Sequence, residues 1–403
     1  MGSGWLPTDR QFLLLKACLA PPHEAHDALV AWRGGGDEAE DAASRRLLPL
    51  LWKRWAGMGM QRLPSAWKDD YLRSWRKGQL AAARANRLGQ LFAGDAIPTL
   101  LIKGLPLALE AYADLGNRPM ADIDLVVPFE QARTAVERLL QAGWQPAPTP
   151  LKGGGKDSAT LSSAWLSQPR RLERFDPCYL RVRHSHGFHH PDGTEMDLHW
   201  FLFEGQCDPG TDDGPWQRAS GLASRCRVRQ VQPLATLQSL GSADHLLLLL
   251  AHGARWNPVP PIRWIPDAVL LLRATTAVDW SCFVAEAVRR DLAPTALVML
   301  RWLEQRFQVG LPAEVLRELT GAANSRQVRR LVAAAGERPG WGSGLEELRY
   351  LRRRHRRLRR EAAGGQVVPP FPRFVCDILG APDTGSVISY ARSELTRRWD
   401  LQG

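Results

Sequence analysis

LIKGLPLALEAYADLGNRPMADIDLVV, residues 101–127, contains a short apolar segment, a glycine, a helix-forming run and a second apolar segment that carries two acids. This second segment, residues 121–127, has the composition of a strand, although Asp122 and Asp124 interrupt it. Because side chains alternate along a strand, the two carboxylates are expected on one face, about 6.6 Å apart. Ionised carboxylates at that separation repel each other, and withdrawing each from water is costly unless a positive charge neutralises it.

A hard divalent cation is the counter-charge that suits such a pair. Mg²⁺ takes oxygen ligands and keeps coordination positions open for water and phosphate. A third acid, Asp197, lies in TEMDLHW (residues 194–200), where apolar residues flank it as they flank Asp124. If the two strands pair at about 4.8 Å, Asp197 reaches the same place, and three acids make a two-metal site possible. The alternative for Asp122 and Asp124 alone is an edge strand with two exposed acids.

Residues upstream of the two acids suggest a phosphate-binding turn. Lys103 and Gly104 stand where the first apolar segment passes into a helix. Gly104 permits close approach of the backbone, and a helix N-terminus offers free amide groups and a positive dipole to phosphate. Arg118, four residues before Asp122, adds a guanidinium that can bind phosphate. We therefore predict that Lys103, Gly104 and Arg118 bind a nucleotide.

Together these motifs resemble the DNA polymerase beta-like nucleotidyltransferase superfamily. The chain is most similar to its bacterial branch of uncharacterised nucleotidyltransferases, in KG followed by Tyr112, then Arg118 with DIDLVV, then MDLHW. The resemblance runs from the N-terminal helices to roughly residue 300. Two positions depart from the pattern: Asp197 stands where this branch usually has Glu, and Leu105 stands where many members have Ser, which removes a hydroxyl from the triphosphate site.

The resemblance implies an enzyme that transfers a nucleoside monophosphate from an NTP to an acceptor and releases pyrophosphate, with Mg²⁺ or Mn²⁺ as cofactor. It implies that Asp122 and Asp124 bind the metals that bridge the triphosphate, and that Asp197 completes the metal that activates the acceptor hydroxyl. The expected acceptor is a small molecule, a sugar or a peptide. A tRNA- or protein-modifying transferase is the alternative, and so is a non-catalytic relative that binds a nucleotide or peptide within a biosynthetic assembly.

The resemblance also implies an α+β fold, with a small mixed sheet and flanking helices in a polymerase beta-like core. Helical periodicity before and after the sheet predicts an N-terminal helical region at 1–94, a core at 95–232 and a C-terminal helical domain at 233–403. Within the core, the run KGGGK at 152–156 favours a flexible connection over a lid across the phosphates, because the strand-to-helix context of a P-loop is missing.

Two clusters of histidines leave alternatives open. In RHSHGFHH, residues 183–190, His184 and His186 share a strand face that His199 could join, which would suit zinc. Structural or substrate-contacting histidines are favoured, because no cysteine or acid lies at the spacing of a closed zinc site. In the resembling family a helix carrying His and a Trp-x-x-Asp element border the nucleotide, which implies nucleotide-binding roles for His252 and Asp267. A polar pair in the helical core is the other interpretation of these two residues.

The overall charge points toward anionic partners. The chain has 403 residues, a formal net charge of +11 and a pI near 9.8, which favours polyanions but also simply aids solubility. The clearest basic segment, EELRYLRRRHRRLRR at 346–360, predicts a helix with an apolar stripe and arginines around the remainder. An amphipathic surface helix is the favoured interpretation, and an electrostatic contact with RNA or an acidic acceptor is the alternative.

Other features set limits on location and redox chemistry. The six cysteines are scattered without a Cys-x-x-Cys pair, which excludes a zinc ribbon or a dithiol redox motif. No apolar run approaches the roughly 18 residues that span a bilayer, and MGSGWLPTDR lacks the character of a signal peptide. We therefore expect a cytoplasmic protein without a membrane span.

Overall fold

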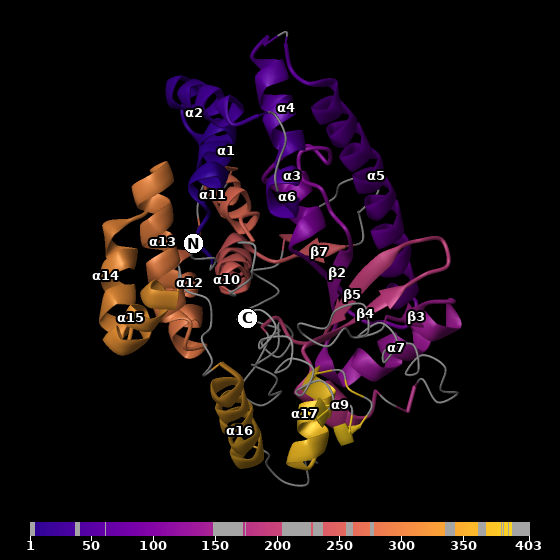
Figure 1. Cartoon of the computed structure of the whole chain (residues 1–403). Coiled ribbons are helices and arrows are strands. Elements are labelled where there is room, and N and C mark those ends of the chain that lie inside the picture. The colour runs from indigo at the N-terminus through magenta and orange to yellow at the C-terminus, as the bar shows by residue number, and fades with distance from the viewer. Residues whose placement is uncertain are drawn as a thin grey trace, which may run out of the picture. The chain divides into compact units, whose positions relative to one another are not determined.

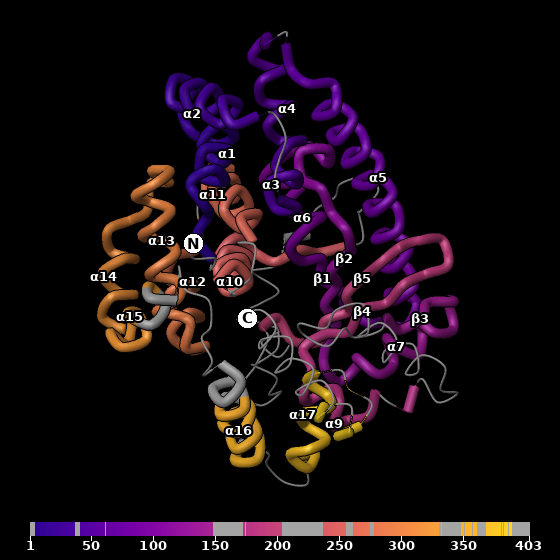
Figure 2. The backbone as a smooth tube through the Cα atoms, viewed as in Figure 1, coloured from indigo at the N-terminus to yellow at the C-terminus, as the bar shows by residue number. Residues whose placement is uncertain are grey.

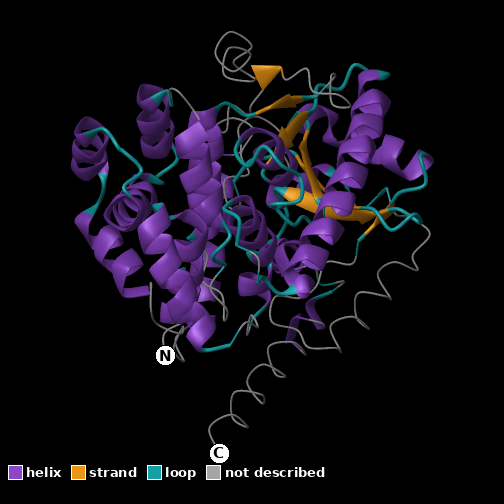
Figure 3. Ribbon diagram, turned by 90° about the horizontal axis from the view of Figure 1, so that it is seen from above, coloured by secondary structure: helices purple, strands orange, loops and turns teal. Residues whose placement is uncertain are grey.

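The computed structural model describes most of the chain, in segments separated by gaps. The described residues are 5–36, 41–60, 62–147, 172–173, 175–203, 227–228, 237–254, 261–274, 278–334, 343–361 and 368–388 without 380, 382 and 386. Helices dominate this part of the chain, and the strands form a small mixed sheet (Figure 3). The α+β class expected from the sequence is confirmed. None of the described helices is both long enough and apolar enough to cross a membrane.

The described chain groups into two compact units, each built from three segments. Unit 1 consists of Met1–Asn86, Leu101–Ala121 and Arg225–Gly340, and unit 2 of Arg87–Leu100, Asp122–Ser224 and Trp341–Gly403. One boundary falls immediately before Asp122, so the second acid-bearing strand begins a new unit. The division into 1–94, 95–232 and 233–403 stays a prediction. It separates continuous stretches of sequence, whereas each compact unit combines stretches that lie far apart in the sequence.

Unit 1 is mainly helical. Its elements are α1 (Asp9–Leu19), α2 (Pro22–Gly34), α3 (Ala42–Arg45), α4 (Leu48–Gly57), most of α5 (Ser65–Ala93), α6 (Gly104–Glu110), β6 (Arg227–Val228), β7 (Gln238–Ser239), α10 (Ser242–Gly253), α11 (Trp264–Ala274), α12 (Trp280–Arg289), α13 (Ala293–Phe307), α14 (Ala313–Ala322) and α15 (Ser325–Ala334). A reciprocal capping box of Thr8 and Gln11 starts α1. Although far apart in sequence, α1 packs against α11 (Figure 2).

Unit 2 contains the acid-bearing strands and the C-terminal helices. Its elements are β2 (Ile123–Val126), the 3₁₀ turn η1 (Phe129–Gln131), α7 (Ala132–Gln141), β3 (Gln145–Pro146), α9 (Pro177–Val182), β4 (Ser185–His189), β5 (Glu195–His199), α16 (Ser343–Glu361) and α17 (Phe371–Leu379) (Figure 1). The strand β1 (Leu100–Ile102) falls on the boundary between the units. At the end of the chain, α17 packs against both α9 and α16.

Within unit 2 the strands lie in the order β3-β4-β5-β2. The β3–β4 and β4–β5 pairs are antiparallel and β2–β5 is parallel. The turn at residues 190–193 joins β4 to β5, as the sequence HPDG predicts, with Gly193 at φ 81° and the His190 amide donating to the Thr194 carbonyl at 2.9 Å. In the register between β2 and β5, Leu125 stands opposite Leu198, and both side chains are fully buried.

An aromatic cluster and one tryptophan hold β4 and β5 against α9. The Tyr179 hydroxyl and His186 Nδ1 are hydrogen-bonded at 2.6 Å, and both rings pack edge-on against Phe175. Trp200, fully buried after β5, donates its indole N–H to the carbonyl oxygens of Leu180 at 2.6 Å and Arg183 at 2.8 Å. These contacts fix the strand from which Asp197 projects.

Candidate active site

Asp124 and Asp197 stand side by side on the adjacent strands β2 and β5 of unit 2. Parallel pairing places Asp124 directly opposite Asp197, and Leu125 opposite Leu198. Residues opposite each other on paired strands project to the same face, so the two carboxylates share one face while the leucines fill the other. This is the arrangement of a third acid beside the Asp-x-Asp motif that the sequence suggested.

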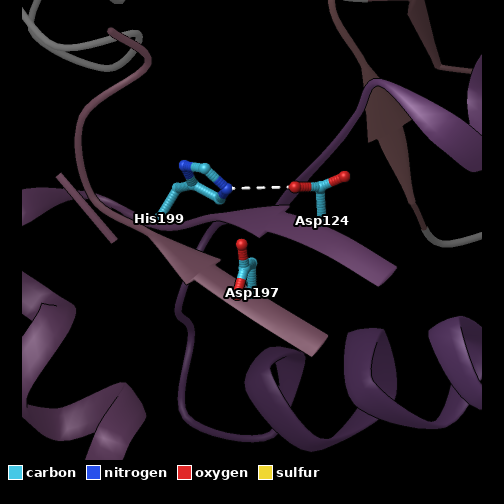
Figure 4. A group of neighbouring side chains, drawn as sticks. All are labelled: Asp124, Asp197 and His199. Atoms are coloured by element: carbon cyan, nitrogen blue, oxygen red, sulfur yellow. Dashed lines mark hydrogen bonds and ion pairs between the residues drawn. The ribbon is translucent and has the colours of Figure 1, made fainter. Parts of the chain in front are cut away.

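His199 completes a group of three possible metal ligands. One ligand atom from each of Asp124, Asp197 and His199 lies within 4.8 Å of the others. His199 Nε2 is 3.1 Å from Asp124 Oδ1, and the His199 ring is 1% exposed. Figure 4 shows the imidazole and the Asp124 carboxylate pointing toward each other from neighbouring strands, with Asp197 beside them.

The spacing and chemistry of this group fit a divalent ion. Two donors bound to one octahedral ion at about 2.1–2.2 Å lie about 3.0 Å apart, close to the observed distance of 3.1 Å between Nε2 of His199 and Oδ1 of Asp124. Carboxylates suit Mg²⁺ and Mn²⁺, whereas an imidazole suits transition metals. The donor set can therefore hold a divalent metal.

A glycine makes room for the Asp197 carboxylate. Gly187 on β4 lies opposite Asp197. A Cβ at position 187 would stand 3.1 Å from Asp197 Oδ1 and 3.3 Å from the Ala147 Cβ, which is tighter than ordinary van der Waals contact. The glycine in HSHGFHH thus leaves the third acid free of a neighbouring side chain on β4.

Asp122 is not a member of this metal-ligand group. It is half-buried and precedes β2, which begins at Ile123. The alternation expected to place Asp122 and Asp124 on one face applies only within the strand, so it does not fix where the Asp122 carboxylate points. Among the described residues the metal-ligand group contains Asp124, Asp197 and His199. The catalytic and metal-binding role of Asp122 stays a prediction.

In unit 1, Lys103 and Gly104 form the turn into α6. Lys103 has φ 55° and ψ −107°, a rare conformation for a residue with a side chain, and its backbone N–H donates to His245 Nε2 at 3.0 Å. His245 is 1% exposed in α10. A Cβ at Gly104 would stand 2.9 Å from Arg118 Nη1 and 3.1 Å from the Met120 sulfur. Glycine is thus required here by a close guanidinium, and the phosphate-binding role of the turn stays a prediction.

Arg118, Asp267 and Tyr112 form a buried network in unit 1. Arg118 donates from Nε to Oδ1 and from Nη2 to Oδ2 of Asp267, both at 2.8 Å, and the two side chains are 4% exposed. The Tyr112 hydroxyl donates to the same Oδ1 at 2.8 Å. This is the bidentate geometry that makes arginine–carboxylate pairs strong. No local pattern in the sequence indicates that Arg118 and Asp267, 149 positions apart, are bonded to each other.

The charges in this network explain the ionisation of its members. Burial by itself raises the pKa of Asp267, but the Arg118 guanidinium outweighs burial and holds the pKa below its ordinary value. Burial, together with the Asp267 carboxylate, raises the pKa of Tyr112 well above its ordinary value. Tyr112 is therefore a neutral donor and Asp267 an ionised acceptor. The observed partner of Asp267 is Arg118, whereas the polar pair considered from the sequence joined Asp267 to His252. The nucleotide-binding roles of Arg118 and Asp267 remain predictions.

His252, predicted together with Asp267, lies at the last turn of α10 and is exposed. Its neighbours at 255–260, including Trp256, lie outside the described residues. Its predicted nucleotide-binding role therefore remains a prediction.

The histidines near β4 have separate environments. His186 is 1% exposed and packs among Phe175, Tyr179 and Phe188, on the face opposite Asp197. The His184 ring contacts the His199 ring, with centroids 5.4 Å apart. Within the described segments, His184, His186, His189 and His190 are not part of any group with metal-ligand spacing. A structural role is therefore favoured for His186.

The sequence pattern indicates His199 only as a possible zinc ligand beside His184 and His186. Its position two residues after Asp197 is the feature of the sequence that indicates their proximity, because it places both side chains on one face of β5. What the sequence lacks is the register that sets Asp124 opposite Asp197.

Some predicted features cannot be compared with the structure. The run KGGGK at 152–156 lies outside the described residues, as do Cys207 and Cys226. The four described cysteines, Cys18, Cys178, Cys282 and Cys376, are free thiols. Burial raises the pKa of Cys18 to about 12, which leaves this thiol protonated and inert at neutral pH.

Comparison with known proteins gives one family. A family model described as "Uncharacterised nucleotidyltransferase" matches residues 40–308, well over half of the chain. The match includes all three residues of the metal-ligand group and the turn at Lys103. No curated protein matches the sequence significantly.

Proposed function

Because the chain belongs to the family of uncharacterised nucleotidyltransferases, we propose that it is a metal-dependent enzyme that transfers a nucleoside monophosphate from an NTP to an acceptor hydroxyl or phosphate. The single observation that supports this most is the register of β2 and β5, which places Asp124 opposite Asp197 with His199 beside them. The family itself implies an NTP substrate. A small molecule, a sugar or a peptide is the proposed acceptor.

In the proposed reaction an acceptor oxygen attacks the α-phosphorus of the NTP. A new P–O bond forms to the acceptor, the bond between the α-phosphorus and the bridging oxygen breaks, and pyrophosphate leaves. A bound divalent metal supplies positive charge to the phosphates and lowers the pKa of a bound hydroxyl. Asp124, Asp197 and His199 would hold that metal, and Asp197 would accept the proton of the acceptor hydroxyl. Asp122 and the turn at Lys103 and Gly104 are assigned by family resemblance to metal and phosphate binding.

His199 favours a transition metal such as Mn²⁺ over Mg²⁺. Mg²⁺ is a hard ion that prefers oxygen ligands, whereas an imidazole nitrogen suits the softer transition metals. The remaining two ligands are carboxylates, which both ions accept. The proposed cofactor is therefore Mg²⁺ or Mn²⁺, and the imidazole makes Mn²⁺ the better fit of the two.

The proposal is tested with each of four NTPs labelled separately on the α- and γ-phosphate, with Mn²⁺ and a metabolite extract as the source of acceptors. Nucleotidyl transfer moves the α label onto an acceptor and releases the γ label in pyrophosphate. Release of the γ label as inorganic phosphate would contradict the proposal because it indicates hydrolysis, and movement of the γ label onto an acceptor would contradict it because it indicates phosphoryl transfer. Binding without turnover in all four NTPs would instead favour the non-catalytic relative.

A further inference from the structure

The basic helix α16 uses its apolar stripe within unit 2. Leu351 and Leu358 pack in one buried cluster with Val182 of α9 and Phe374 of α17. Between them His355 is 8% exposed, lies 2.9 Å through Nε2 from the Pro369 carbonyl oxygen and packs against the Phe374 ring. A helix that binds a membrane surface inserts its apolar face into the lipid. The apolar face of α16 is already covered by protein, which argues against that use.

Apart from the exposed Leu348, the rest of the described surface of α16 is cationic. Six of its arginines are exposed: Arg349, Arg352, Arg353, Arg356, Arg359 and Arg360. Arg349 and Arg353, Arg352 and Arg356, and Arg356 and Arg360 stand four positions apart, where like charges face each other along a helix and destabilise it. Packing of the leucine stripe must therefore hold the helix against this repulsion.

Neighbouring acids do not balance these charges. In the sequence no Asp or Glu stands three or four positions from any of the last five of these arginines, Arg352 through Arg360. Other helices differ: Arg317 pairs with Glu314 at 3.0 Å, and Arg290 pairs with Glu286 at 3.1 Å. The chain thus places acids beside arginines elsewhere, whereas the acids of α16, Glu346, Glu347 and Glu361, stand only near its two ends and leave these five exposed arginines without an acid three or four positions away.

The spacing of the charges matches a phosphate backbone. From Arg349 to Arg360 the helix rises about 17 Å, and a nucleic acid duplex carries about ten phosphates over that length. Each arginine can bind a phosphate through two parallel N–H donors. An acidic protein surface of ordinary composition intersperses both signs of charge and lacks this density.

We propose that the exposed arginine face of α16 binds the phosphate backbone of a nucleic acid. The contact is electrostatic and independent of base sequence. It stands apart from the proposed transfer reaction, because none of its residues belongs to the metal-ligand group. RNA and DNA offer the same backbone chemistry, and the experiment below separates them.

The test uses the full chain and a charge-matched control. The variant R353Q/R356Q/R360Q removes three exposed arginines of α16, and R317Q/R326Q/R329Q removes three exposed arginines of α14 and α15. Each lowers the formal net charge from +11 to +8, since 11 − 3 = 8. Circular dichroism checks the folding of both, and Gln is a good helix former, so neither should unfold.

Fluorescence anisotropy then measures binding of labelled RNA and DNA duplexes of one sequence over a range of salt. We expect the α16 variant to bind about 10- to 100-fold more weakly at low salt, with the slope of log K against log salt reduced by about 2 to 3. The control should retain affinity. Tighter binding of one duplex identifies that nucleic acid as the partner.

Three outcomes would overturn the proposal: no binding of either duplex at low salt, an equal loss in both variants, or binding of phosphatidylserine vesicles in preference to both duplexes. The second outcome would show that net charge alone is responsible. The third would show that a lipid surface is the partner.

Discussion

Asp124 in unit 2 and Asp267 in unit 1 are buried acids with opposite surroundings. They are 8% and 2% exposed. Asp267 receives two N–H donors from Arg118 and the hydroxyl of Tyr112, so its charge is balanced within the protein. Asp124 instead faces a second carboxylate, Asp197, and the imidazole of His199.

This difference shows that burial alone does not distinguish a structural acid from a metal ligand. A carboxylate held by a bidentate guanidinium already has its counter-charge. Two carboxylates and an imidazole on one face of the sheet are all possible metal ligands, and a bound cation would supply the counter-charge for the two carboxylates. The charge of the nearest side chains therefore separates the two sites, and each of the following substitutions acts on that contrast.

The largest expected effect is on Asp124. Asp124→Asn should lower the rate of pyrophosphate release by about a thousandfold, about 4 kcal/mol, because it removes a charge that acts on the bound metal. The free energy of unfolding should change little or increase, since the repulsion with Asp197 is relieved. NTP consumption at the original rate in a folded Asp124→Asn protein would remove Asp124 from the site.

Asp267→Asn should act on stability. Loss of the carboxylate leaves the Arg118 guanidinium buried beside a neutral amide, which should reduce the free energy of unfolding by about 3–5 kcal/mol in urea titrations. The exposed pair Arg317–Glu314 provides the control, because Glu314→Gln should cost less than about 0.5 kcal/mol. A cost for Asp267→Asn no greater than for the control would show that the two buried sites do not differ as described.

His199→Gln should sharpen the contrast through metal affinity. Loss of the imidazole should weaken Mn²⁺ binding by about 10- to 100-fold, measured from the electron paramagnetic resonance signal of free Mn²⁺ after removal of metal with a chelator. Mg²⁺ affinity should fall less, because Mg²⁺ gains less from nitrogen. His186→Gln is the matched control, since His186 is equally buried but faces the aromatic cluster. Equal losses in the two variants would indicate a folding effect.

Gly187→Ala should have a smaller effect on catalysis. The added methyl group presses on Asp197 Oδ1 and should displace it by a few tenths of an ångström, lowering the rate by about tenfold, about 1.4 kcal/mol. The control is Gly57→Ala, where nothing lies within 4 Å of an added Cβ. Unchanged turnover in Gly187→Ala would mean that the position of Asp197 is not critical.

The smallest expected effect is a loss of stability in acid, and this loss does not occur at neutral pH. The pKa of Asp267 is lower in the folded chain than its ordinary value, so the stability that the pair contributes is complete above about pH 4. It is lost as pH falls through the lower, folded pKa. Urea titrations of the original protein below pH 4 should show this loss, and Asp267→Asn should show less of it. Identical pH dependence in the two proteins would contradict the assignment.

The sequence predicts the elements of the site better than their pairing. Strand alternation and flanking apolar residues indicate Asp124 and Asp197 as inward-facing acids, and the motif resemblance relates them to each other. The hydrogen bond from His199 to Asp124 depends on the register between β2 and β5, which no local pattern encodes. The Arg118–Asp267 pair was equally inaccessible, because it joins residues 149 positions apart through tertiary packing.

Local sequence patterns also do not predict which segments of the chain make up each compact unit. Helical periodicity identifies the N- and C-terminal helices, but it does not show that α16 and α17 pack with α9. These contacts depend on a few apolar side chains, such as Val182 and Phe374, and helical periodicity does not show which helix each of them packs against. The fold class follows from the order of elements, and the assembly of each unit follows from long-range contacts.

Trp200 carries a practical consequence for how this protein can be produced. Family similarity ends at residue 308, and a gene trimmed there would omit Leu351, Leu358 and Phe374, which cover Val182 at the end of α9. The Trp200 indole donates to carbonyl oxygens at the end of α9 and just after it. Exposing Val182 would therefore also disturb β5, the strand that bears Asp197. The recognisable family region is thus shorter than the piece of chain that must be expressed together.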